Sequence, residues 1–193
     1  CHAIVWQDRR TASFCDALKE EGLDDEVFMR TGLHIDPYFT GTKIRWMLDN
    51  VPGAKEAADS GRAIAGTIDS WLIWNLTGGR VHATDRSNAS RTMLFDLKDL
   101  DWDGDLLDIV GVPRTLLPDA EPTGHVFGTT DADAIGTEIP IAASMGDQQA
   151  ALLGQLCLGE GDVKITFGTG GFLLMNVGES PKLSRNGLLT TVA

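Results

Sequence analysis

The chain has 193 residues, of which 42% are hydrophobic, and it carries a formal net charge of −12 at pH 7. This length is enough to bury one substantial core and part of a second. The negative charge argues against nucleic acid or an anionic membrane as a partner, because both are bound through an excess of Lys and Arg. No run approaches the roughly 20 apolar residues of a membrane-spanning helix, so we expect no membrane insertion.

The cysteines Cys1, Cys15 and Cys157 are an odd number and show no Cys-x-x-Cys spacing. Isolated cysteines of this kind are typical of reduced thiols, and no basic, apolar leader opens the chain, so we expect a cytoplasmic protein. The sequence begins at Cys1 and ends on Val192 and Ala193 inside an apparent strand. We therefore expect an internal piece of a longer protein.

The first half of the chain alternates short apolar runs with segments of helical spacing. We predict strands at 2–6 and 63–65 and helices at 8–22, 24–30, 40–51, 52–61 and 67–76. The inward face of the last helix is predicted to consist of Ile68, Trp71, Leu72 and Leu76. Trp6 ends the first strand, and in parallel α/β sheets the carboxyl ends of strands line the ligand crevice. Trp6 is therefore either a core aromatic or a wall of a ligand site.

The second half changes its pattern near residue 157. Before that point we predict a helix at 102–110, a strand at 125–128, an acidic loop at 131–138, a strand at 139–143 and a helix after Asp147. After it we predict consecutive strands at 162–167, 171–177 and 188–192. Such a change is expected where one domain gives way to another. We therefore predict a first domain at 1–157 and the opening strands of a second domain at 158–193.

Asp147 is the first candidate for catalysis, because it joins a predicted buried strand to an amphipathic helix. Gly146 supplies the tight turn, and Asp147 is predicted to lie at or near the helix N-cap. There the first backbone N–H groups and the helix dipole favour an ionised carboxylate. A charged acceptor on a turn suits a general base that removes a proton from an alcohol. A plain capping role is the alternative.

A glycine-rich turn follows about twenty residues later. The segment 164–176 is predicted to form two short strands joined by Gly168, Thr169, Gly170 and Gly171. Glycines let backbone N–H groups approach an anion closely, and the Thr169 hydroxyl adds a donor, so the tip is a candidate phosphate site. It is neither a dinucleotide fingerprint nor a P-loop. A purely structural hairpin is the alternative.

Taken together, the two stretches resemble a known family. Gly-Asp-Gln-Gln-Ala-Ala at 146–151 and Thr-Phe-Gly-Thr-Gly-Gly-Phe-Leu-Leu-Met-Asn at 166–176 closely resemble the sugar and polyol kinases built on the actin-like ATPase fold, and within them the glycerol kinases. The resemblance continues in order through Ala-Ile-Val-Trp-Gln-Asp at 3–8, Ile-Asp-Pro-Tyr-Phe at 35–39, Gly-Thr-Ile-Asp-Ser-Trp at 66–71, Ser-Asn-Ala-Ser-Arg-Thr-Met at 87–93 and Asn-Gly-Leu-Leu-Thr-Thr at 186–191. It therefore covers the length of the chain.

The resemblance implies an α/β protein of the ribonuclease H-like, actin-like ATPase fold, with most of the first, substrate-binding domain and the first strands of the second, nucleotide-binding domain. It implies ATP-dependent phosphorylation of glycerol to sn-glycerol 3-phosphate, with glycerol and ATP as ligands and Mg²⁺ as the metal. It also implies a homo-oligomer for the full-length protein. No residue of this chain is assigned to the metal.

The resemblance also assigns roles to individual residues. Asp147 would be the catalytic base, and Gln148 would help to hold glycerol. The walls of the glycerol site would be Trp6, Tyr38 and Phe172. The γ-phosphate would lie against Gly168, Thr169 and Gly170.

Several departures from the family limit these roles. The family's first phosphate loop, its arginine–glutamate pair for glycerol and its adenine-binding motifs are absent from these residues. Gly171 replaces a cysteine of the glycerol kinases, and Arg86 replaces a tyrosine. Two alternatives remain open: a kinase for another polyol, a pentulose or a hexulose, and a non-catalytic binding protein of the actin-like fold.

Overall fold

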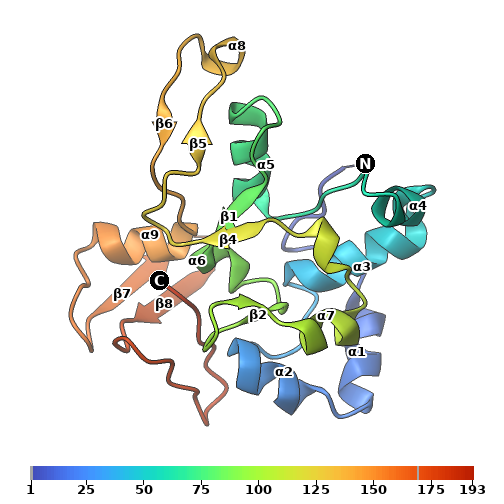
Figure 1. Cartoon of the computed structure of the whole chain (residues 1–193). Coiled ribbons are helices and arrows are strands. Elements are labelled where there is room, and N and C mark those ends of the chain that lie inside the picture. Colours follow the sequence, from blue (N-terminus) through green and yellow to red (C-terminus); the bar gives the residue numbers. More distant parts are fainter. Residues whose placement is uncertain (1, 169) are drawn as a thin grey trace.

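The computed structural model describes residues 2–168 and 170–193 (Figure 1). The helices are α1 (Ala12–Glu20), α2 (Asp24–Thr31), α3 (Thr40–Asn50), α4 (Ala54–Asp59), α5 (Ile68–Leu76), α6 (Arg86–Ala89), α7 (Gly104–Val110), α8 (Ala132–Ile135) and α9 (Asp147–Gly154), with a 3₁₀ turn at Arg114–Leu116. The strands are β1 (Ala83–Asp85), β2 (Phe95–Asp96), β3 (Asp101–Trp102), β4 (Asp119–Glu121), β5 (Gly128–Thr129), β6 (Pro140–Ile141), β7 (Val163–Phe167) and β8 (Gly171–Met175).

The strands pair two by two. β1 and β4 are parallel, with α5 packed against β1, and the pairs β2–β3, β5–β6 and β7–β8 are antiparallel. In Figure 1 the β5–β6 pair and α8 form an arm that projects beside α5, and the β7–β8 hairpin lies beside α9. The described residues thus mix helices with one parallel and three antiparallel pairs of strands.

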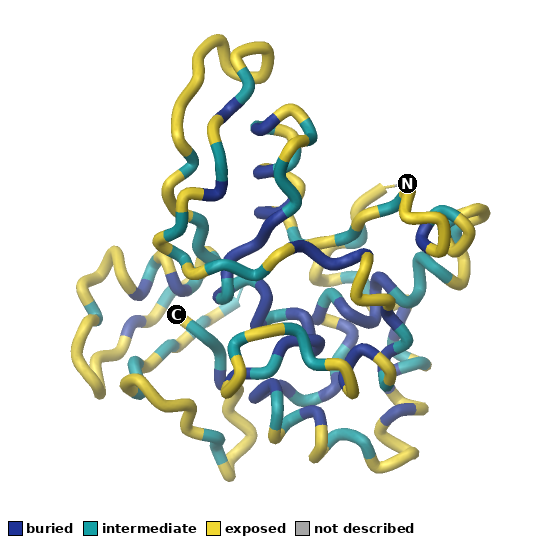
Figure 2. Tube along the Cα trace, in the orientation of Figure 1, coloured by how far each residue is buried: buried dark blue, intermediate teal, exposed yellow. Residues whose placement is uncertain are grey.

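The core lies among α1, α2, α3, α4 and α7. Figure 2 shows the buried segments gathered there, whereas the β5–β6 arm is largely exposed. The main cluster comprises Cys15, Leu18, Val27, Leu33, Ile35, Phe39, Met93 and Leu106. A second cluster comprises Ile44, Ala58, Leu94, Leu107, Val110, Val112, Leu116 and Leu117. The two clusters hold most of the buried apolar side chains of the described residues, and burial of apolar surface is the main source of hydrophobic stabilisation.

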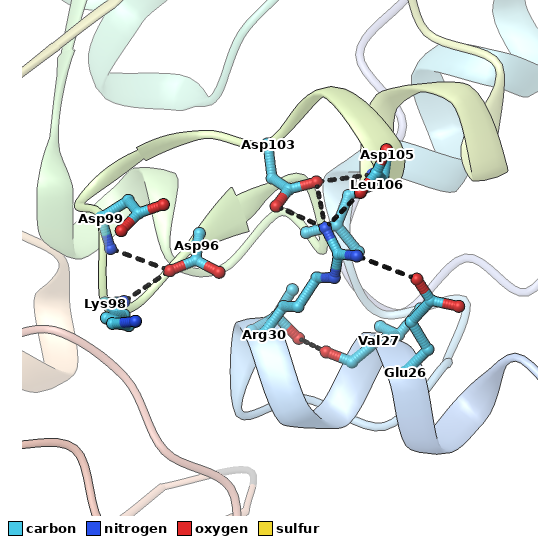
Figure 3. A network of polar contacts seen from close by, with 10 residues as sticks. Glu26, Val27, Arg30, Asp96, Lys98, Asp99, Asp103, Asp105 and Leu106 are labelled. Atoms are coloured by element: carbon cyan, nitrogen blue, oxygen red, sulfur yellow. Dashed lines mark hydrogen bonds and ion pairs between the residues drawn. The ribbon is translucent and has the colours of Figure 1, made fainter.

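A charged network joins α2 to the start of α7 (Figure 3). The Arg30 guanidinium lies 2.8 Å from a carboxylate oxygen of Asp103 and 2.8 Å from one of Asp105, and 3.1 Å from Glu26. Asp103 is the N-cap of α7, where its side chain accepts the N–H of Leu106 at 2.9 Å. One carboxylate therefore caps a helix and holds a neighbouring helix in place.

Three predicted strands are wrong. Residues 2–6, 63–65 and 188–192 form no strand, because apolar composition alone does not supply the neighbouring strand that must accept and donate backbone hydrogen bonds. Within the described residues, the segments 63–65 and 188–192 each make a single backbone hydrogen bond of the kind that a strand would repeat. The Ala65 N–H donates to the Leu116 carbonyl at 2.8 Å, and the Thr190 N–H donates to the Gly32 carbonyl at 2.9 Å.

The predicted inward face of α5 is also wrong. Ile68, Trp71 and Leu72 are exposed, and the helix buries Asp69, Ser70 and Ile73 instead. The Asp69 carboxylate accepts the Thr84 hydroxyl of β1 at 2.6 Å. Burial raises the pKa of Asp69, and its hydroxyl partners act in the opposite direction. A polar face that finds such partners can be buried in place of an apolar one.

Among the described residues no helix is long and apolar enough to cross a membrane. The division into domains at residues 157 and 158 stays a prediction.

Candidate active site

Five of the predicted site residues lie along one open groove, whereas the predicted phosphate residues Gly168 and Gly170 are not among its lining residues. Trp6, Tyr38, Asp147, Gln148 and Phe172 all belong to its lining. The groove measures about 2880 Å³, whereas a pocket for one small ligand usually measures about 300–1,000 Å³. The groove is therefore larger than a pocket for one small ligand, and the contacts within it define two groups of residues.

The first group surrounds Asp147, which is exposed and is the first residue of α9. Gly146 holds the N-cap position, so the carboxylate lies in the first turn, where the helix dipole favours negative charge. The Gln148 backbone N–H donates to one carboxylate oxygen at 2.8 Å. The Gln148 side-chain Nε2 donates to the other at 3.2 Å. Both oxygens are thus oriented by the next residue of the helix.

The turn before Asp147 is anchored from the buried side. The Gly146 N–H donates to the hydroxyl of Ser87, a fully buried residue of α6, at 2.8 Å. A Cβ on Gly146 would lie 2.6 Å from Oε1 of Gln149, so only glycine fits at this turn without displacing that side chain. Gln149 is itself buried and donates to the Thr191 hydroxyl and to the Val192 carbonyl, both at 3.1 Å.

A lysine of β7 completes this group. The Lys164 ammonium donates to Oε1 of Gln148 and, at 2.8 Å, to the Thr166 hydroxyl. Lys164 is 1% exposed although it is charged. It therefore links the helix that bears Asp147 to the strand that leads into the glycine turn.

The second group surrounds Tyr38. The rings of Trp6 and Tyr38 lie with their centroids 5.7 Å apart at 57°, and both line the groove. The ammonium of Lys43, a buried residue of α3, donates to the Tyr38 carbonyl at 2.6 Å. The Arg91 guanidinium lies 5.1 Å from the centroid of the Phe39 ring. Two cations thus contact the adjacent residues Tyr38 and Phe39.

Burial affects the pKa of both cations. It lowers the pKa of the Lys43 ammonium, against the raising effect of the carboxylates of Asp8 and Asp36. It also lowers the pKa of the Arg91 guanidinium, and the Tyr38 hydroxyl acts in the opposite direction. Both cations line the groove beside Tyr38.

The glycine turn forms as predicted, as the tip of the β7–β8 hairpin. Thr166 pairs with Phe172 and Phe167 pairs with Gly171, and Phe172 is half-buried. The Gly168 N–H donates to the Gly170 carbonyl at 3.0 Å, so it is engaged within the turn. A Cβ on Gly168 would meet nothing within 4 Å, which leaves open space beside the turn. Thr169, the predicted hydroxyl donor, lies outside the described residues.

The structure therefore brings Tyr38 to Trp6 and Gln148 to Asp147, whereas Phe172 lies on the hairpin. Sequence reasoning missed four residues that hold these side chains: Lys43, Ser87, Arg91 and Lys164. A signal existed only for Lys164, which alternates with Val163 and Ile165 and so faces the other side of the strand. Alternation normally assigns such a lysine to solvent, and here it is buried against α9.

Comparison with known proteins places the chain in a family. Residues 1–154 match the FGGY family of carbohydrate kinases, N-terminal domain. Glycerol kinase 2 of Thermotoga maritima is 58% identical over 192 residues, and glycerol kinase of Petrotoga mobilis is 56% identical over 192 residues. Both matches cover 100% of this chain but 39% of the relative, so the chain spans well under half the length of these curated relatives.

Solved structures give the same picture. The crystal structure of Plasmodium falciparum glycerol kinase with ADP matches with a TM-score of 0.94 and 38% identity, over 98% of this chain and 38% of that one. Ligand-bound xylulose kinase from Lactobacillus acidophilus matches with a TM-score of 0.73 and 25% identity, over 88% of this chain and 34% of that one. The predicted actin-like ATPase fold of the sugar kinases is confirmed. Since the family match extends over most of its length, the chain belongs to the FGGY family of carbohydrate kinases.

Proposed function

We propose that this chain forms the acceptor-binding and base-bearing part of an ATP-dependent glycerol kinase, which converts glycerol to sn-glycerol 3-phosphate. The observation that carries the proposal is the position of Trp6, Tyr38, Asp147, Gln148 and Phe172 along one groove. The high identity to glycerol kinases along the whole chain supports glycerol as the acceptor.

In this proposal Asp147 accepts the proton of a terminal hydroxyl of glycerol while that oxygen attacks the γ-phosphorus of ATP. The bond between the γ-phosphorus and the bridging oxygen breaks, ADP leaves, and the proton remains on Asp147. Gln148 holds the polyol through its amide. Trp6, Tyr38 and Phe172 contribute apolar surface that excludes water from the reacting atoms, so catalysis consists mainly of positioning.

The resemblance of the glycine turn to that of the sugar kinases supports a phosphate there, held with the help of Gly170 and Thr169. The Gly168 N–H is not the donor in this arrangement, because the Gly170 carbonyl accepts it. Mg²⁺ is proposed as the partner of the ATP phosphates. Within residues 2–168 and 170–193 no three acidic, histidine or cysteine side chains form a metal site, so we assign no step to the ion.

Three further properties belong to the same proposal: a cytoplasmic location, ATP as the phosphoryl donor, and a homo-oligomeric full-length protein. A pentulose or hexulose kinase would share the fold, as the xylulose kinases do. A non-catalytic actin-like protein would bind ligand without turnover. Each alternative predicts a different result when glycerol is the only acceptor.

The test is the Asp147→Asn variant of the full-length protein, assayed for ADP formation with glycerol and ATP. We expect binding of both substrates to change by less than about threefold, and turnover to fall by about 10²–10⁴, because a general base contributes that much. Asp162→Asn, which changes an exposed carboxylate just before β7, is the matched control. Near-normal turnover of Asp147→Asn would exclude Asp147 as the base, and an unmodified protein without glycerol-dependent turnover would exclude the function.

A further inference from the structure

The side chain that the proposed reaction leaves unused is Lys164. It is one of the largest fully buried side chains of the described residues, at 1% exposure, and it carries a positive charge. Lysines are almost never fully buried unless their charge is compensated. In residues 2–168 and 170–193 no carboxylate lies within salt-bridge distance of its ammonium. An ion pair therefore does not explain the burial of Lys164, which depends on its hydrogen bonds instead.

The two acceptors of the Lys164 ammonium belong to different elements. One is Oε1 of Gln148 on α9, and the other is the Thr166 hydroxyl on β7, at 2.8 Å. β7 and β8 both pack against α9. The ammonium thus forms a polar link across the contact between the helix of the proposed base and the hairpin of the glycine turn.

This link determines which way the Gln148 amide faces. An amide has an oxygen that only accepts and a nitrogen that only donates, and the two ends occupy nearly the same volume. Because the ammonium only donates, it requires the oxygen of Gln148 on its side. The Nε2 group is then directed to Asp147, where it donates to a carboxylate oxygen at 3.2 Å. The contacts form a chain from Lys164 through Gln148 to Asp147.

We propose that Lys164 is a positioning residue, which orients the carboxylate of Asp147 through Gln148 and holds it at a set position relative to the glycine turn. The inference rests on the proposed function. Asp147 is exposed and projects into an open groove, so its side chain has little packing to restrain it. Misplacement of a catalytic group by about 1 Å can cost about 10²-fold in rate.

The test is a double-mutant cycle in the full-length protein, with Lys164→Met and Gln148→Met, both of which nearly preserve side-chain volume. We expect Lys164→Met to lower kcat for glycerol phosphorylation by about 10-fold to 100-fold and to change KM for ATP by less than about twofold. In the Gln148→Met background Lys164→Met should lower kcat by less than about threefold, because the Gln148 amide that connects Lys164 to Asp147 is already missing. A merely structural lysine would lower kcat by the same factor in both backgrounds.

Two variants serve as controls. Lys55→Met removes an exposed lysine of α4 and should leave kcat unchanged. Thr166→Val removes the other acceptor of Lys164 and keeps the contact to Gln148, so it should lower kcat by less than about threefold. If Lys164→Met does not fold, Lys164→Gln takes its place, since its shorter side chain withdraws the donor from Gln148 but remains polar.

The outcomes separate the two proposals. An unmodified enzyme that does not phosphorylate glycerol would overturn the proposed function. An active enzyme whose Lys164 variant keeps its kcat, or loses the same factor in both Gln148 backgrounds, would overturn only the role of Lys164. Loss of kcat that depends on Gln148 supports it.

Discussion

At the scale of single residues, the site shows that positioning depends on neighbours that carry no chemistry. Ser87 holds the turn before Asp147, and Lys43 holds the backbone of Tyr38. Each of these contacts uses a buried polar group, which is costly to leave without a partner. Substitutions at these buried positions should therefore disturb the site as well as the stability of the chain.

Phe172 gives a prediction at this scale. Phe172→Ala in the full-length protein should raise KM for glycerol by about tenfold and KM for ATP by less than about twofold, because it removes a wall of the polyol site only. Ile165→Ala is the matched control: its side chain lies on the opposite face of the same hairpin and outside the groove lining. Initial rates at varied glycerol and varied ATP measure both constants. An increase in KM for ATP alone would show that Phe172 belongs to the nucleotide site.

At the scale of elements, the cap of α7 couples local structure to packing. Burial opposes ionisation of Asp103, but the N–H of Leu106 and the guanidinium of Arg30 outweigh it, and the pKa of Asp103 is lowered. A lowered pKa in the folded state means that the ionised carboxylate stabilises the fold above its unfolded pKa of about 3.9. The contribution is lost as the pH falls through the folded-state pKa.

Asp103→Ala should therefore reduce the free energy of unfolding by about 1–2 kcal/mol at pH 7, as the loss of an N-cap does. The difference from the unmodified chain should shrink below about pH 4, where the carboxylate becomes protonated. Asp105→Ala is the control, since Asp105 also contacts Arg30 but its side chain is 69% exposed, and it should cost less than about 0.5 kcal/mol. Urea unfolding at several pH values measures both, and an effect of Asp103→Ala that does not depend on pH would contradict the assignment.

At the scale of the whole molecule, the groove is wide and one face of the β7–β8 hairpin is exposed to solvent. Val163, Ile165 and Phe167 share a face with Leu173 and Met175 of the opposite strand, and all five side chains are exposed, Phe167 by 86%. Phosphoryl transfer depends on groups that clamp both substrates, and the chain spans 39% of the length of the curated relatives. The proposed base alone therefore does not make a complete site.

We accordingly predict that the 193-residue chain by itself forms no glycerol-dependent ADP. A coupled assay with purified chain, glycerol and ATP measures this, with the full-length protein as the positive control. Activity of the chain that disappears in its Asp147→Asn variant would contradict the prediction, because it would show that these residues suffice for turnover.

The sequence by itself determined the features that depend on local patterns and on motifs. The helices α1 to α5, the β7–β8 hairpin with its glycine tip and the turn that presents Asp147 all follow from residue order, since caps, glycines and periodicity act within a few residues. The motifs around Asp147 and the glycine turn were also sufficient to indicate the family.

Only the tertiary structure decided which face of an element is buried. In α5 and in β7 the face that carries polar residues is the buried one. Asp69 of α5 accepts a hydroxyl hydrogen bond from Thr84, and Lys164 of β7 donates to Gln148. Periodicity locates a face but does not reveal the partners that come from distant parts of the chain. Burial of a charged group is favourable only when those partners are in place, so neither Lys164 nor Lys43 could be assigned to the site from the sequence.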